Sequence, residues 1–111
     1  MELSKKDKKT ARELIEKGLQ KEFANGLSEA DAILRNWKNN QTDNQAAYQL
    51  LYKMIIKFDK HIGRRYDGMT GSNYIFIVAA QLADEVVSKD DLKEFSPEVK
   101  AAILLLSRTE G

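Results

Sequence analysis

The sequence predicts an all-α protein: a single domain at residues 1–111, folded as an irregular bundle of four to five helices. Apolar residues recur three and four positions apart through most of the chain, the spacing that gives a helix one buried side. Only one of the 111 residues is proline and 32% are charged, a composition typical of helix-rich globular proteins. The helical segments are separated by short polar stretches, with no internal repeat and no interdomain linker.

The first 38 residues are expected to form two helices. Ser4 can cap the first helix, with Asp7 at its third position. An Asn-Gly pair ending at Gly26 is expected to stop this helix, because glycine tolerates the left-handed conformation of a helix end. Ser28 is then expected to open a short second helix that runs through Trp37. The apolar stripe of the first helix consists of Ala11, Leu14, Ile15, Leu19 and Phe23.

The third expected helix is the longest of the chain. A polar loop at residues 39–44 ends with an N-cap, and from there the helical pattern continues to about Tyr66. Gly63 lies inside this helix, at a cost of about 1 kcal/mol relative to alanine. One side of the helix is predicted to point at the core, and it carries Ala47, Leu51, Met54, Ile55, Phe58 and Ile62.

A fourth helix is expected after the glycine-containing turn at residues 68–71, with Ser72 or Asn73 as its cap. The β-branched and aromatic residues at 74–78 are also typical of a strand. The helical pattern nevertheless continues through Val87, which favours a helix. Its buried seam would consist of Ile75, Val78, Ala79, Leu82 and Val86.

The chain is expected to finish with a short stub and one more helix. Residues 89–95 read as a turn or helical stub. Ser96 and Pro97 are a strong helix start, since serine caps well and proline suits the first helical position. This last helix, to about Ser107, is apolar around most of its circumference. That pattern indicates either a central place in the core or a surface completed by another chain.

Four basic residues of the third helix fall on one ridge at i, i+4, i+7 and i+11, with no acidic residue on that face of the helix: Lys53, Lys57, Lys60 and Arg64. We call them the basic ridge. It leads into a turn and a helix start, whose backbone N–H groups favour anions. The ridge is an anion site, a solvated face, or a face that the acidic last third of the chain neutralises. The candidate residues for binding an anion or a partner are Lys53, Lys57, Lys60, Arg64, Arg65, Gly71, Ser72 and Asn73.

A second candidate surface is rich in tyrosine. Tyr48, Tyr52 and Ile56 lie off the apolar seam of the third helix, and Tyr74 and Ile77 lie on the polar side of the fourth. Tyrosine is enriched at protein interfaces, so these five residues are candidates for a protein-binding patch. In a bundle of five helices they would alternatively face other helices of the same chain.

The residue types limit the chemistry that the sequence predicts. There is no cysteine, so disulfides and thiolate ligands are excluded. His61, the single histidine, stands without a Glu-x-x-His pair, and we predict no metal site, cofactor or catalytic residue. An enzyme at the turn after His61 would need a pocket that contains this side chain. A helix-turn-helix is disfavoured because the segment at 28–31 is acidic where phosphates would approach.

The leading prediction is therefore a non-catalytic protein-interaction or regulatory module, whose partner is another protein or a second copy of the chain. The alternative is a nucleic-acid binder without sequence preference, which would use the basic ridge and Arg65 on backbone phosphates. The net charge of +1 argues weakly against that alternative. No apolar run approaches the roughly 20 residues that span a bilayer, and no secretory signal is recognised. We expect a cytoplasmic protein without membrane association.

Overall fold

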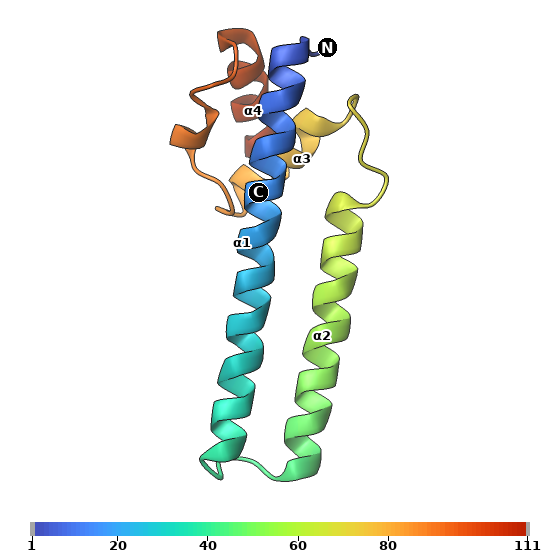
Figure 1. Ribbon diagram of the computed structural model, residues 1–111, viewed down its shortest axis with the longest axis vertical. Coiled ribbons are helices and arrows are strands. Elements are labelled where there is room, and N and C mark those ends of the chain that lie inside the picture. The colour runs from blue at the N-terminus through green and yellow to red at the C-terminus, as the bar shows by residue number, and fades with distance from the viewer. Residues whose placement is uncertain (1, 111) are drawn as a thin grey trace. The chain divides into compact units, whose positions relative to one another are not determined.

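The computed structural model describes residues 2–110, excluding the side chain of residue 110, and confirms the all-α prediction (Figure 1). Within these residues there are four α-helices, one 3-10 helix and no strand. The elements are α1 (Lys5–Lys38), α2 (Asn44–Tyr66), α3 (Tyr74–Ala83), the 3-10 helix η1 (Lys89–Leu92) and α4 (Pro97–Glu110).

The chain divides into two compact units. The first contains the residues up to 21 and those from 68 onward, and we call it the terminal unit. The second contains residues 22–67, and we call it the hairpin. Helix α1 contributes its N-terminal half to the terminal unit and its C-terminal half to the hairpin.

Helix α1 is one continuous helix of 34 residues, so the predicted stop at Gly26 and the predicted new start at Ser28 are wrong. Gly26 is buried, and a Cβ atom there would lie 2.9 Å from Cζ of Phe58. This glycine therefore lets an aromatic ring of α2 approach the backbone of α1. Phe58 also contacts Phe23 edge to face, with ring centroids 5.8 Å apart.

The core of the terminal unit is built by α1, α3, α4 and the segment between α3 and α4. Its buried apolar residues are Leu3, Ala11, Leu14, Ile15, Ile75, Ile77, Val78, Ala79, Val86, Val87, Leu92, Phe95, Val99 and Ile103. The predicted capping of the first helix is present, since Asp7 N donates to Ser4 Oγ at 3.1 Å. Asp7 also accepts from the backbone N and from Oγ of Ser96 at 3.0 and 2.8 Å, which ties the start of α4 to the start of α1.

Helix α3 is shorter than predicted and more completely covered. It ends at Ala83, and Glu85 adopts a left-handed φ of 59°, so the buried Val86 lies beyond the helix. Ile77, expected on an exposed side, is 7% exposed, and that expectation is wrong. Because α3 packs against α4 and carries no charged residue, apolar positions on more than one of its sides are buried.

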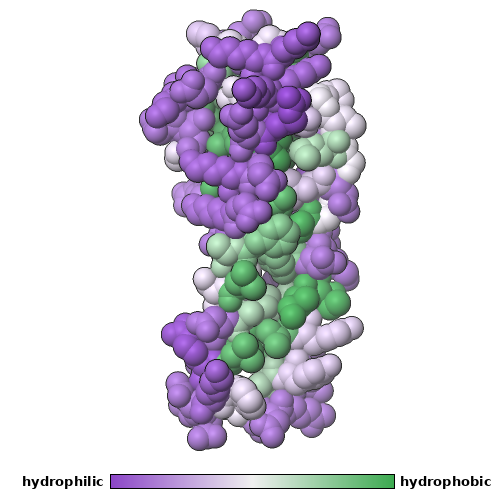
Figure 2. Space-filling view, viewed as in Figure 1, coloured by the Kyte–Doolittle hydropathy of each residue, from purple (hydrophilic) through white to green (hydrophobic). Residues whose placement is uncertain are grey.

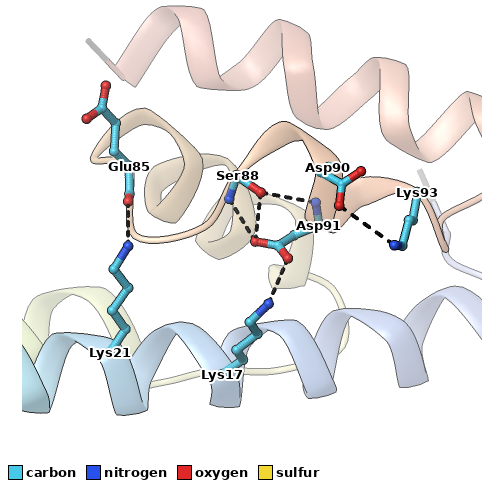
Figure 3. Close-up of polar contacts among 7 residues, drawn as sticks. All are labelled: Lys17, Lys21, Glu85, Ser88, Asp90, Asp91 and Lys93. Atoms are coloured by element: carbon cyan, nitrogen blue, oxygen red, sulfur yellow. Dashed lines mark hydrogen bonds and ion pairs between the residues drawn. The ribbon is translucent and has the colours of Figure 1, made fainter.

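Side chains of α1 hold the segment that follows α3. Lys17 Nζ pairs with Asp91 Oδ1 at 2.8 Å, and Lys21 Nζ donates to the carbonyl oxygen of Glu85 at 3.3 Å (Figure 3). Asp91 and Ser88 cap η1 reciprocally, which confirms the predicted stub. The hydrogen bond from Lys17, followed by the backbone N–H of Ser88, lowers the pKa of Asp91 below its usual value.

The hairpin consists of the C-terminal half of α1 and the antiparallel α2 (Figure 1). Helix α2 has nearly the predicted bounds, and Asp43 caps it by accepting from Ala46 N at 2.7 Å. Trp37 Nε1 donates to Asn44 Oδ1 at 2.7 Å, across the loop between the helices. Of the 23 residues of α2, all of them described, Ala47 and Tyr66 are buried, so this helix covers little apolar surface within the chain.

Candidate interaction surface of the helical hairpin

The basic ridge of α2 lies at the surface. Lys53, Lys57, Lys60 and Arg64 are all exposed, and none of them forms an ion pair within the hairpin. Arg65 differs from these four, because its side chain is 9% exposed and Nη1 donates to a carboxylate oxygen 2.8 Å away. The predicted anion-binding set therefore loses Arg65, whose guanidinium is engaged inside the hairpin.

That carboxylate belongs to Glu22, a buried residue on α1 that the sequence did not single out. Glu22 Oε1 lies 2.7 Å from His61 Nε2 and accepts from Arg65, while Oε2 accepts from the hydroxyl of Tyr66. These partners are 39 to 44 residues away in the sequence, so no local sequence pattern indicates the cluster. Its effect is to fix α1 against α2 through charge-assisted hydrogen bonds.

The His61 side chain is 42% exposed and borders a shallow pocket of about 250 Å³. The other lining residues are Glu29, Met54, Lys57 and Phe58. All of them belong to the hairpin, and no residue of the turn at 68–73 is among them. Among the described residues, no group of three or more His, Cys, Asp or Glu side chains is arranged to hold a metal ion.

The turn at residues 68–73 lies in the terminal unit, whereas the basic ridge lies in the hairpin. Asn73 Oδ1 accepts from Thr70 N at 2.8 Å, and the hydroxyl oxygens of Thr70 and Ser72 are 2.8 Å apart. Gly71 packs against the side chain of Lys8, whose Cε would be 3.4 Å from an added Cβ. The polar side chains of this turn thus close the turn itself, and Asn73 makes no side-chain cap to α3.

Large apolar side chains gather on one face of the hairpin. On α1 they are spaced by four, seven and three residues, and on α2 by four and three, so each set lies along one side of its helix. A shallow pocket of about 200 Å³, lined by Leu34, Trp37 and Tyr48 among others, joins the two sets. We call this surface the apolar face: Phe23, Leu27, Leu34 and Trp37 of α1, with Tyr48, Tyr52 and Ile55 of α2.

Figure 2 shows the apolar residues gathered over the C-terminal half of α1 and over α2 in the lower part of the view. Two predictions for this region change. Ile55, expected in the core, is 51% exposed, and Phe23, expected in the first buried stripe, is exposed as well. Tyr48 and Tyr52 are exposed, as is Ile56, which points away from α1 beside this face. Tyr74 is half-buried at the start of α3.

The opposite flank of the hairpin is different in character. A pocket of about 370 Å³ there has a mixed lining. Its polar and charged members are Glu29, Asn36, Lys53 and Lys57, and its apolar members are Ala32, Ile33, Leu50 and Met54. The basic ridge therefore borders this flank, and the apolar face lies on the other. The hairpin presents two chemically distinct surfaces, one apolar and aromatic and one that mixes apolar side chains with cations of the basic ridge.

None of the described helices is both long enough and apolar enough to cross a membrane. Comparisons with protein-family models, with curated proteins and with solved structures gave no match to this chain. We therefore infer a function from the surfaces of the hairpin.

Proposed function

We propose that this protein is a non-catalytic protein-interaction module that binds its partner through the apolar face of the hairpin. The observation that supports the proposal is the exposure of seven large apolar side chains on one surface, each exposed by 38–72%. At about 200 Å² for a large side chain, these fractions correspond to roughly 700 Å² of apolar surface. The largest apolar patch of a typical monomer is about 300–600 Å².

The composition of this face also supports a protein partner. Three of its seven members are Tyr or Trp, the residue types enriched at the centres of protein interfaces. These side chains offer large contact area with few rotatable bonds, so little conformational entropy is lost when they become fixed.

The experiment is affinity purification of the tagged protein from its native cells after nuclease treatment, with bound proteins quantified by mass spectrometry. Two variants form a matched pair. Ile55→Glu alters the apolar face at a residue 51% exposed, and Leu50→Glu alters the other flank of the same helix at a residue 54% exposed. We expect Ile55→Glu to lose the bound protein and Leu50→Glu to retain it. Equal retention by both variants would refute this function.

A second function, nucleic-acid binding without sequence preference, is supported by the basic ridge, whose four exposed cations have no ion-pair partner within the hairpin. Four phosphate contacts on duplex DNA predict that log K falls with log salt at a slope of about −3.6. Lys57→Gln should reduce this slope by about one. Arg35→Gln is the control, since Arg35 is also exposed, on α1, but pairs with Asp31 at 2.9 Å. A slope near zero would exclude this function.

A further inference from the structure

We infer that the occupant of the apolar face is a second copy of this chain, with two hairpins packing face to face into a four-helix bundle. This inference rests on the proposed function, because it names the partner of the same surface.

The hairpin is incomplete as a helical bundle. Two antiparallel helices have one shared contact line, and α2 buries Ala47 and Tyr66 among its 23 residues. A four-helix bundle encloses a core on which each helix has two neighbours. A second hairpin laid on the apolar face would give α1 and α2 of each copy that second neighbour.

The dimensions of the apolar face fit such a partner. Along α1 it extends from Phe23 to Trp37, which is about 21 Å at 1.5 Å per residue. Across the hairpin it is two helices wide, since α1 and α2 both contribute. A single peptide helix would cover one of these two rows, whereas another hairpin covers both. The roughly 700 Å² of apolar surface approaches the 800 Å² or so that each partner buries in a standard interface.

The two flanks of the hairpin differ in charge, and this difference favours self-association through the apolar face. None of the seven residues of the apolar face is charged, and Asp31 and Arg35, elsewhere on α1, pair with each other at 2.9 Å. A second copy therefore meets no concentration of like charge there. On the other flank the basic ridge of one copy would face the basic ridge of its partner, which is repulsive. Pairing through the apolar face leaves both ridges directed outward.

The test uses the purified full chain. We expect light scattering and sedimentation to give twice the chain mass of 12.6 kDa at tens of micromolar. Ile55→Glu and, on α1, Leu27→Lys should each weaken dimerisation by about thirtyfold or more, the effect of losing an interface hot spot. Leu50→Glu should leave the dimer intact. Circular dichroism checks that every variant keeps the helical content of the wild type.

The single tryptophan supplies an independent signal, because Trp37 lies on the apolar face. We expect its fluorescence to shift to longer wavelength on dilution, in parallel with the loss of dimer mass. In Ile55→Glu the same shift should occur at a concentration about thirtyfold or more higher. A wild-type protein that stays monomeric at 12.6 kDa, or a dimer that only Leu50→Glu disrupts, would overturn the inference. In the monomeric case, capture of a different protein that Ile55→Glu abolishes would leave the proposed function standing. Absence of such capture would overturn both the dimer inference and the proposed function.

Discussion

Alanine at Gly18 should destabilise the protein even though alanine is the better helix former. Gly18 lies buried in α1, and an added Cβ would be 2.3 Å from Nε2 of Gln81 and 3.2 Å from Cγ1 of Val86. Gln81 is 0% exposed, and its Nε2 donates to the carbonyl oxygen of Ile15 at 3.1 Å. The new methyl group and the amide cannot occupy the same space, and the amide has no exit to solvent.

The size of the effect follows from three contributions. Overpacking a core by one methyl group costs about 1–3 kcal/mol. Displacing a buried hydrogen bond costs about 1–3 kcal/mol. Replacing glycine by alanine in a helix interior stabilises the helix by about 1 kcal/mol. The net loss in the free energy of unfolding for Gly18→Ala is therefore about 3 kcal/mol.

Gly63→Ala is the matched control, because the substitution is the same and the surroundings differ. The nearest atom to a Cβ at Gly63 is Oδ2 of Asp67 at 3.1 Å, the end of an exposed side chain that can move. This variant should be stabilised by up to about 1 kcal/mol. Urea titration followed by circular dichroism measures the free energy of unfolding of both variants. In a Gln81→Ala background, Gly18→Ala should cost less, with a coupling of about 1–3 kcal/mol. Equal stabilisation by both alanines would refute this reasoning.

Three further predictions concern polar contacts. The backbone N–H of Ser96 lowers the pKa of Asp7 below 3.8. The ionised Asp7 therefore stabilises the fold fully above about pH 3.8, and this stabilisation is lost as the pH falls through the lower pKa of the folded state. In urea titrations from about pH 5 to about pH 2, the advantage of wild type over Asp7→Asn should shrink. Glu22→Gln replaces a buried carboxylate that accepts from Arg65 and Tyr66 and lies 2.7 Å from His61 Nε2, and it should cost about 3 kcal/mol in unfolding free energy. Lys17→Met should cost less than about 1 kcal/mol, because Lys17 is exposed. The same substitution should raise the pKa of Asp91 toward its usual value, as measured by NMR titration.

The elements with local signals were predictable from the sequence. Helix α2 begins at the expected polar loop because the cap, Asp43, lies within three residues of the N–H group that it accepts from. The stop at Gly26 was mispredicted for the opposite reason. A glycine that ends a helix and a glycine that admits a ring look alike in the sequence. The deciding residue, Phe58, is 32 positions away. The Glu22 cluster was missed for the same reason of distance.

Ile55 was wrongly predicted to be buried for a different reason, and this reason bears on function. The helical pattern assigned Ile55 to the same buried seam as Ala47 and Met54, and the apolar arc of α2 continues through Tyr48 and Tyr52. One neighbouring helix covers only part of such an arc, and within the hairpin α1 buries Ala47 but leaves Ile55 51% exposed. The arc is wide enough for two neighbours, of which the hairpin supplies one. The exposed position of Ile55 is therefore the strongest reason to look for a partner on this face.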